Sequence, residues 1–377
     1  MRCDDLMSLV FLLSDKDIEN SETFSKIKNI DYLAVLDLAN SEFLTSALYY
    51  RMDKHGLFDI IEDEKLHAFL RELFVLNTRR NEQILLQLKE IASIFQGADI
   101  ELLLLKGAAS LVEQEYEHIG IRYLSDIDLM VQPEEVEKAY SLLIDAGYKN
   151  VGFNYSFDDS HRHLPPLEKE GMPAIVELHR RAVKEVSIAK TISFAPYAAY
   201  KIDSTDFPGT WAFKPVYRLY HAFVHTEVDD NHYDLRVLDL RHLYDFTVLA
   251  KRYDQEVDWL ELSQMIESFG LTKNFQSYLY TAKRLFGLET PLTIDTSDVH
   301  DDYRKILKSF ELRNTLRGKL YPLLPKLHHI YSSKRIRSIY KYDNHLYYIF
   351  YLVKYLVYQL KTHVFCKGCL KYIISRL

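Results

Sequence analysis

Two carboxylates lie two positions apart in a short apolar segment, at Asp126 and Asp128. In an extended strand, residues i and i+2 point to the same face, so these carboxylates would lie side by side while Ile127 and Leu129 face the core. Magnesium prefers such a set of oxygen ligands and keeps open positions for water and phosphate oxygens. The same spacing also occurs in solvated acids at strand ends and in transferases that bind nucleotide sugars.

The segments around this pair predict a small β-sheet. The apolar run 100–105 ends at Lys106-Gly107, a pattern typical of a buried strand that enters a turn, and a helix is expected over 108–117. After the strand 126–131, a proline and two glutamates indicate a helix start, and Gly147 marks the end of that helix. Further short extended segments are expected at 148–155, 161–164 and 174–179.

Helical periodicity dominates on both sides of this predicted sheet. Apolar residues recur at helical spacing from about Asp31 to Phe95, and again beyond Pro215 to the C-terminus. The expected fold is therefore α+β, mostly α overall, with a small mixed sheet that has helices on one side and helical regions at both flanks. The predicted divisions are an N-terminal helical region at 1–97, a sheet-containing core at 98–205 and a C-terminal helical region at 206–377.

The composition fits a folded protein with a large core. Hydrophobic residues make up 48% of the 377 residues, and only 12 Gly and 10 Pro favour long helices over a turn-rich all-β fold. A net charge of −7 argues against a surface adapted throughout to nucleic acid. The N-terminal apolar stretch is too short and too acidic for a secretory signal, no run of about 20 apolar residues marks a membrane span, and three cysteines are too few for a disulfide framework. These features predict a cytoplasmic location.

Three stretches carry a resemblance to a known family: LLKGAASL at 104–111, RYLSDIDLMV at 122–131 and VELH at 176–179. Their order resembles the DNA polymerase β-like nucleotidyltransferase superfamily, and their wording is most similar to its uncharacterised bacterial nucleotidyltransferase family. The resemblance implies an enzyme that moves a nucleoside monophosphate from an NTP, by default ATP, to an acceptor hydroxyl with two Mg²⁺ ions. It implies that Asp126 and Asp128 hold the metals and that Glu177 is the third carboxylate.

The position of Glu177 agrees with that role. Val176 and Leu178 would face the core, so Glu177 would stand on the opposite face of its strand. In a two-metal mechanism one ion activates the acceptor hydroxyl, and the other stabilises the triphosphate and the leaving pyrophosphate. Glu177 could also take the hydroxyl proton. The alternative is an exposed strand acid without a part in the chemistry.

The expected nucleotide contacts depart from the superfamily pattern. Lys106 and Gly107 stand where most members carry Gly-Ser, so the usual serine contact is not assured. Gly107 could still let backbone N–H groups approach a phosphate, Ser110 could donate a hydroxyl, and Lys106 offers a positive charge. Arg122 is a candidate phosphate clamp, and Ser125, directly before the carboxylate pair, is a further candidate nucleotide contact. The alternatives are a lysine that extends to solvent and an arginine paired with a nearby carboxylate.

Several histidines could line the acceptor side of a cleft. His179 shares a strand face with the third carboxylate, and it could meet the nucleotide or the acceptor or simply be packed. His221 and His225 lie four positions apart on one helical face, and Arg236 and Asp239 follow on the next helix. No third ligand lies at a recognisable spacing from this histidine pair, so a zinc site is not predicted.

The C-terminal tail is basic, apolar and aromatic. From Lys334 onward, nine Lys and Arg residues stand against the single acid Asp343, which gives the tail a net charge of +8. This composition suits peripheral contact with an anionic membrane or an acidic partner, and packing on the acidic body is the alternative. Cys366 and Cys369, preceded by His363, have no second pair of cysteines near them, so thiols without a metal are expected.

Two other functions compete with nucleotidyl transfer. A catalytically inactive nucleotide-binding or scaffold protein of the same fold would explain the missing Gly-Ser pair, but the retention of all three acids counts against it. A metal-dependent glycosyltransferase should have a larger nucleotide-sugar-binding domain before its Asp-x-Asp pair. The sequence leaves the acceptor open among a small molecule, a glycan, a protein and RNA.

Overall fold

The computed structural model describes residues 3–14, 21–151, 161–192 and 194–312 of the chain. The described residues up to Glu311 form one compact unit. The basic tail, with His363, Cys366 and Cys369, lies outside the described residues, and so does part of the predicted extended segment 148–155. The predictions on these segments therefore stay predictions.

The described part of the chain consists of helices and seven short strands. The strands are β1 (Leu102–Leu104), β2 (Asp126–Met130), β3 (Lys149–Asn150), β4 (Leu167–Glu168), β5 (Ile175–His179), β6 (Ala199–Lys201) and β7 (Thr210–Phe213). The α-helices are α1 (Cys3–Leu13), α2 (Ser21–Lys28), α3 (Tyr32–Ser41), α4 (Thr45–Lys54), α5 (Leu57–Ile61), α6 (Glu64–Gln96), α7 (Lys106–Val112), α8 (Val136–Asp145), α9 (Val186–Ala189), α10 (Pro215–Phe223), α11 (His232–Leu235), α12 (Leu240–Arg252), α13 (Trp259–Ser268), α14 (Thr272–Phe286) and α15 (Thr296–Leu312). A 3₁₀ turn at Pro133–Glu135 precedes α8, and a π-helix at Val224–Asp229 continues α10.

The strands of the described residues form one mixed sheet with the order β3-β4-β5-β2-β1-β7-β6. The pair β2–β5 is parallel, β1 runs antiparallel to β2, and β7 runs parallel to β1. This arrangement confirms the predicted α+β class with a mixed sheet and a mostly helical remainder. Strands β4, β6 and β7 were not predicted, because segments of two to four residues carry too little alternation to stand out.

Alternation along the strands divides their side chains between two hydrophobic clusters. Ile127 and Leu129 of β2 point to the face that α6 and α8 cover, and they pack there with apolar residues of both helices. The opposite face carries the two aspartates of β2, and its apolar residues Met130 and Phe213 join a second, larger cluster. Helices therefore cover one face fully, while α10 packs against β7 on the other.

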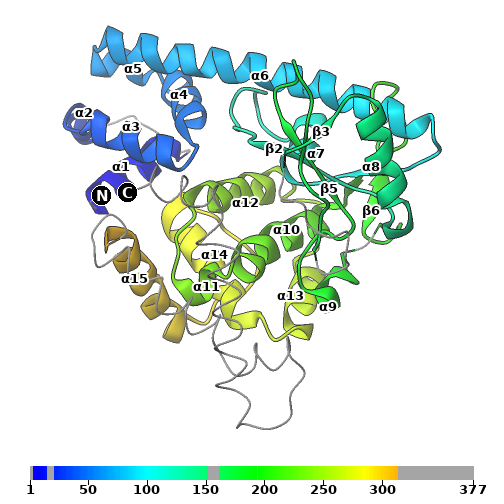
Figure 1. Ribbon diagram of the computed structural model, residues 1–377. Helices are drawn as coiled ribbons and strands as arrows, with labels where there is room; N and C mark the ends of the chain where they lie inside the picture. The colour runs from blue at the N-terminus through cyan, green and yellow to red at the C-terminus, as the bar shows by residue number, and fades with distance from the viewer. Residues whose placement is uncertain (1–2, 15–20, 152–160, 193, 313–377) are drawn as a thin grey trace, which may run out of the picture. The chain divides into compact units, whose positions relative to one another are not determined.

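The long helix α6 connects the N-terminal helices to the sheet. Asp63 caps its N-terminus, because the Asp63 side chain accepts hydrogen bonds from two backbone N–H groups of the first turn. Its first half packs against α4, where Phe74 contacts the ring of Tyr49. Its second half places Ile84 and Phe95 in the cluster beneath the sheet. Figure 1 shows α6 extending from the N-terminal helices to the strands.

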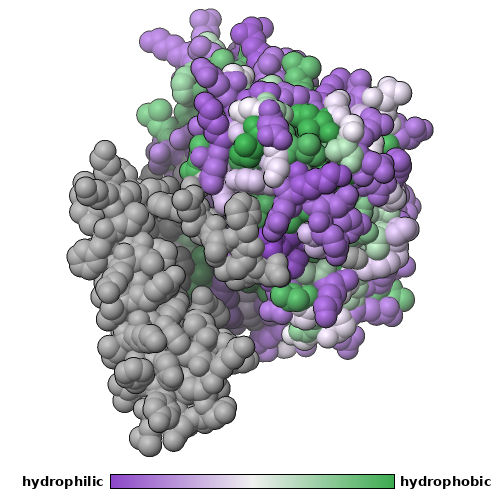
Figure 2. Space-filling view, turned by 45° about the vertical axis from the view of Figure 1, so that its right-hand side comes forward, coloured by the Kyte–Doolittle hydropathy of each residue, from purple (hydrophilic) through white to green (hydrophobic). Residues whose placement is uncertain are grey.

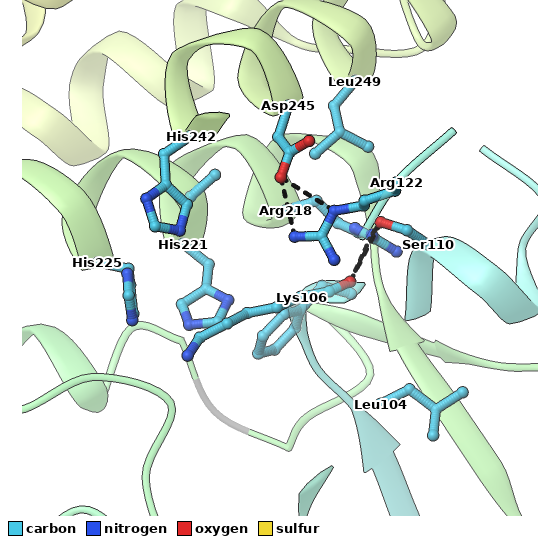
Figure 3. Close-up of a pocket in the computed structure, with 12 residues that line it drawn as sticks. Leu104, Lys106, Ser110, Arg122, Arg218, His221, His225, His242, Asp245 and Leu249 are labelled. Atoms are coloured by element: carbon cyan, nitrogen blue, oxygen red, sulfur yellow. Dashed lines mark hydrogen bonds and ion pairs between the residues drawn. The ribbon is translucent and has the colours of Figure 1, made fainter. Parts of the chain in front are cut away.

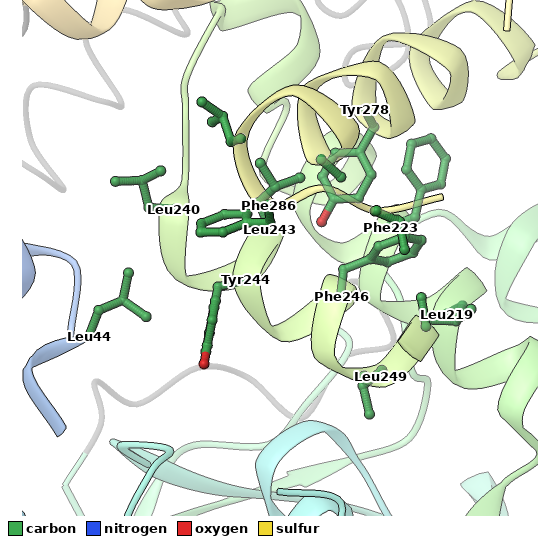
Figure 4. Packing of buried hydrophobic residues seen from close by; sticks show 14 of the residues in the cluster. Leu44, Leu219, Phe223, Leu240, Leu243, Tyr244, Phe246, Leu249, Tyr278 and Phe286 are labelled. Carbon is green, nitrogen blue, oxygen red and sulfur yellow. The ribbon is translucent and has the colours of Figure 1, made fainter. Parts of the chain in front are cut away.

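The N- and C-terminal helical regions share one core. Tyr278 of α14 meets the edges of Phe223 and Phe246, with ring centroids 5.6 and 5.0 Å away. Figure 4 shows this packing, in which Leu44 from the N-terminal region lies in the same cluster as Leu240 of α12. Apolar residues at helical spacing on both sides of the sheet thus meet one another in space.

The helix that follows β1 differs from its prediction. It begins at Lys106 rather than at position 108, and it ends at Val112 because Gln114 has a left-handed backbone with φ +50°.

No helix among the described residues is long and apolar enough to cross a membrane. On the face drawn in Figure 2, hydrophilic side chains predominate and hydrophobic ones form small groups between them.

Candidate active site

Asp128 and Glu177 lie side by side because β2 and β5 are parallel and in register. The pairing sets Asp128 opposite Glu177 and Asp126 opposite Ile175. Paired positions of neighbouring strands face the same side of a sheet, and Val176 is buried in the cluster on the other side. Glu177 is therefore adjacent to Asp128, and it leaves β5 on the face away from the core, as alternation along the strand predicted.

Three of the side chains on this face can share a metal ion. Asp128, Glu177 and His179 each place a ligand atom within 4.8 Å of the other two. Asp126 is not in this group, and its Oδ1 accepts a hydrogen bond of 3.0 Å from the Ser125 hydroxyl. Carboxylate oxygens suit Mg²⁺, and an imidazole nitrogen suits ions such as Mn²⁺ or Zn²⁺. The donor set therefore fits a divalent ion, and it includes a buried histidine that the sequence did not assign to the metal site.

Two cationic or hydrogen-bonding groups converge on one oxygen of Asp128. Its Oδ1 lies 2.9 Å from Lys106 Nζ and 2.9 Å from His179 Nε2. Burial opposes ionisation of Asp128, but the Lys106 charge and the His179 hydrogen bond outweigh it and hold the pKa of this carboxyl well below its usual range. Lys106 is therefore not a lysine that extends to solvent. Its side chain is 20% exposed and leaves a left-handed backbone with φ +43°.

The other two carboxyls respond differently to the same surroundings. Burial and the neighbouring charge of Asp128 raise the pKa of Asp126. Burial acts in the same direction on Glu177, but hydrogen bonding by His179 outweighs it and lowers the pKa of Glu177. His163 Nε2 lies 3.8 Å from Glu177 Oε2, and burial lowers the pKa of His163 despite that carboxylate. The site thus accumulates negative charge that a cation would stabilise.

Arg122 and Gly107 pack against each other at the turn after β1. A β-carbon on Gly107 would lie 1.9 Å from Arg122 Nη1 and 2.8 Å from Leu124 Cγ, so a side chain does not fit there. The guanidinium of Arg122 is held by Asp245 of α12, with 2.9 Å from both Nε and Nη2 to Oδ2 (Figure 3). The Tyr116 hydroxyl donates to the same carboxylate. Arg122 thus forms a structural ion pair across the chain, the alternative to the predicted phosphate clamp.

Ser110 is also engaged within the protein. Its hydroxyl donates to the Lys106 carbonyl at 3.2 Å and accepts from Arg218 Nη2 at 3.2 Å. Arg218 in turn forms a buried ion pair of 2.6 Å with Glu115. The predicted hydroxyl contact to a nucleotide would therefore require Ser110 to leave these partners.

The carboxylates line a cavity of about 260 Å³ together with basic side chains. Lys106 and Arg122 belong to its lining, and an adjoining pocket of about 50 Å³ shares them (Figure 3). Five other members are arginines and histidines from segments far apart in the sequence, and we call these five the basic wall. They are Arg162, His163, His225, Arg241 and His242.

Of the four residues predicted on the next two helices, His225 reaches this cavity. It belongs to the π-helix and lies with its ring centroid 6.3 Å from that of His221, which lines the smaller pocket. Burial lowers the pKa of His221 to about 3, and burial with the Lys106 charge lowers that of His225 well below its usual range. Arg236 pairs with Asp302 at 3.1 Å, and Asp239 caps α12 and pairs with His242 at 2.8 Å.

A comparison with protein families identifies the family to which this chain belongs. The model of the uncharacterised nucleotidyltransferase family matches residues 28–287, more than half of the chain. The chain belongs to this family. No functionally curated protein and no solved structure matches the chain.

The match to the nucleotidyltransferase family includes the paired strands, the basic wall and most of the N-terminal helices. Four residues of the basic wall were not identified from the sequence as site residues. They are Arg162, His163, Arg241 and His242. A signal was present, because His161-Arg-His163 and Arg241-His242 are clusters of basic and imidazole groups in a chain of net charge −7. Nothing in their spacing connects either cluster to the carboxylates, which are brought to them by the fold.

Proposed function

We propose that this nucleotidyltransferase moves a nucleoside monophosphate from an NTP to an acceptor hydroxyl in the cavity between the carboxylates and the basic wall. The proposal is carried by the in-register placement of Asp128 beside Glu177, with Lys106 at 2.9 Å from Asp128. Carboxylates next to cations suit a substrate that brings both a divalent metal and a polyphosphate. We take ATP as the default donor and Mg²⁺, as two ions, as the default metal.

Asp128, Glu177 and His179 would hold one ion, and Asp126 would contribute its carboxylate to the second. When bound, such ions polarise phosphate oxygens and increase the acidity of the acceptor hydroxyl. The acceptor oxygen forms a bond to the α-phosphorus, and the bond from that phosphorus to the bridging oxygen of the β-phosphate breaks. Pyrophosphate leaves with the electron pair of the broken bond. The ionised Glu177 carboxylate accepts the hydroxyl proton, in keeping with its lowered pKa.

The basic side chains have separate tasks in this proposal. Lys106 and Arg241 contact the triphosphate, because both are basic side chains that line the cavity. Ser125 keeps Asp126 oriented through its hydrogen bond. Arg122 and Gly107 act indirectly by fixing the turn that carries Lys106. The acceptor class, the cytoplasmic location and contacts of the basic tail with membranes or acidic partners stay predictions.

The experiment is a binding titration followed by a transfer assay on the purified full chain. Each of the four NTPs is titrated with and without Mg²⁺ against wild type, the double variant Asp126→Asn/Asp128→Asn, and Asp145→Asn, a matched control at an exposed acid. We expect metal-dependent binding that only the double variant loses. ATP labelled at either the α- or the γ-phosphate is then incubated with cell extract. Label should enter a product from the α-position alone, and transfer of the γ-label would contradict the proposal.

A second candidate is a nucleotide-binding protein without catalysis. The observation that favours it is the engagement of the Ser110 hydroxyl with Lys106 and Arg218, which leaves this hydroxyl no free donor for a phosphate. This candidate predicts the same metal-dependent NTP binding without transfer of label and without release of pyrophosphate.

A further inference from the structure

An aromatic pair lines a groove next to the catalytic cavity, and one of its two rings also lines the cavity. Phe43 and Tyr123 stack with ring centroids 5.3 Å apart and planes 10° from parallel. Tyr123 lies three residues before Asp126 and lines both the catalytic cavity and a neighbouring groove of about 340 Å³. Phe43 lies in the turn between α3 and α4 and lines the same groove. The N-terminal helical region therefore contributes an aromatic ring at the edge of the active site.

Two guanidinium groups accompany these rings. Arg80 Cζ lies 5.1 Å from the centroid of Tyr123, and Arg241 Cζ lies 5.5 Å from the centroid of Phe43. Arg80 is fixed because it donates to the carbonyls of Leu124 and Pro173. Arg241 differs, since no acid of the described residues forms an ion pair with it, and it lines the catalytic cavity. The rings thus lie beside a positive charge that a phosphate can use.

Phe43 is held in an unusual conformation for a residue that packing does not bury. Its backbone is left-handed, with φ +57°, and the residue is 50% exposed. A bulky side chain is disfavoured in this backbone region, and exposure of a phenyl ring to water adds no hydrophobic stabilisation. This left-handed residue closes the C-terminus of α3, where the N–H groups of Phe43 and Leu44 donate to the carbonyls of Asn40 and Ala39 at 3.2 and 2.7 Å. The helix end therefore places the ring of Phe43 at the groove and onto Tyr123.

We propose that Phe43 and Tyr123 form a stacking surface for a nucleobase, with Arg241 contacting a phosphate of the same substrate. Nucleobases stack on aromatic side chains irrespective of sequence, and guanidinium groups bind phosphate in the same sites. The inference rests on the proposed function, because nucleotidyl transfer brings a nucleobase into this cavity. The ring belongs either to the donor NTP or to a nucleotide unit of the acceptor. In both cases the N-terminal helices are part of substrate recognition.

The test compares two ligands that differ in the ring. Mg²⁺–ATP and Mg²⁺–tripolyphosphate are titrated against wild type, Phe43→Ala, Phe43→Trp and Phe69→Ala, the last being a matched control at an exposed phenylalanine of α6. We expect Phe43→Ala to weaken ATP binding by about 5- to 150-fold, the range of one base stacked on one aromatic ring. Tripolyphosphate binding should stay unchanged, and Phe43→Trp should retain ATP binding.

A second arm distinguishes donor from acceptor. If ATP binding does not depend on Phe43, the same variants are titrated with a short single-stranded oligoribonucleotide, and a loss confined to Phe43→Ala assigns the ring to the acceptor. Equal losses for ATP and tripolyphosphate would show a structural role of Phe43 and overturn the inference. Binding of ATP and of the oligoribonucleotide that does not depend on Phe43 would also overturn the inference. Failure of the proposed function is recognised separately, because Asp128→Asn would then leave Mg²⁺–tripolyphosphate binding intact.

Discussion

The carboxylate side and the basic wall of the cavity are built in different ways. Asp126, Asp128 and Glu177 stand on two adjacent strands, and backbone pairing between β2 and β5 fixes their spacing. The basic wall comes from the loop before β4, the π-helix and α12, and packing of helices sets its shape. Positions fixed by backbone hydrogen bonds tolerate side-chain changes, whereas positions fixed by packing depend on their neighbours. Substitutions on the two sides should therefore separate effects on activity from effects on stability.

The largest effect is expected for the ion pair that connects the sheet-containing core to α12. Asp245→Leu would leave the Arg122 guanidinium buried without its carboxylate, which costs about 3–5 kcal/mol in the free energy of unfolding. Urea denaturation measures this change. The double variant Arg122→Met/Asp245→Leu serves as the control, because it removes both charges and should recover much of the loss. A single variant as stable as wild type would contradict the assignment of Arg122 to a structural pair.

Asp126→Asn should show the opposite combination. We expect nucleotidyl transfer to fall by about 100-fold or more, since one preorganised charged group is removed from the reacting centre. The free energy of unfolding near neutral pH should rise, because burial and Asp128 raise the pKa of Asp126 and so disfavour its charged form in the folded protein. Activity assays and urea denaturation are run on the same preparation. Loss of stability in this variant would remove the contrast between the two sides of the cavity.

Glu227 tests whether the basic wall depends on the packing of its π-helix. Burial and the Asp239 charge raise the pKa of Glu227 to about 8, so its stabilising contribution is complete below about pH 4.5 and is lost as pH rises through about 8. Relative to Glu227→Gln, wild type should lose on the order of 2 kcal/mol between pH 5 and pH 9, less than the full shift implies because the side chain is partly exposed. Denaturation curves at both pH values measure this loss. An equal loss in wild type and in Glu227→Gln would refute the raised pKa of Glu227.

The smallest effect is expected at Arg241. Because no acid among the described residues pairs with it, Arg241→Gln should leave the free energy of unfolding nearly unchanged. Affinity for Mg²⁺–ATP should fall by roughly tenfold, which is about 1.4 kcal/mol, and the fall should shrink as salt is added. Isothermal titration at two salt concentrations measures both. Arg241→Lys, which keeps the charge, is the control, and an unchanged affinity in Arg241→Gln would place the triphosphate away from α12.

The sequence by itself determined the local structural features of this protein. Period-two alternation predicted that Asp126, Asp128 and Glu177 leave their strands away from the core, and helical periodicity predicted the flanking helices. These patterns are readable because each depends on neighbouring residues and on burial of one face. Only the tertiary structure decided that His179 joins the carboxylates, that Arg122 pairs with Asp245, that Arg162 and Arg241 line the cavity, and that Phe43 lines the neighbouring groove. Those contacts join segments that lie tens to more than a hundred residues apart, and the packing of the whole chain, rather than any local preference, brings them together.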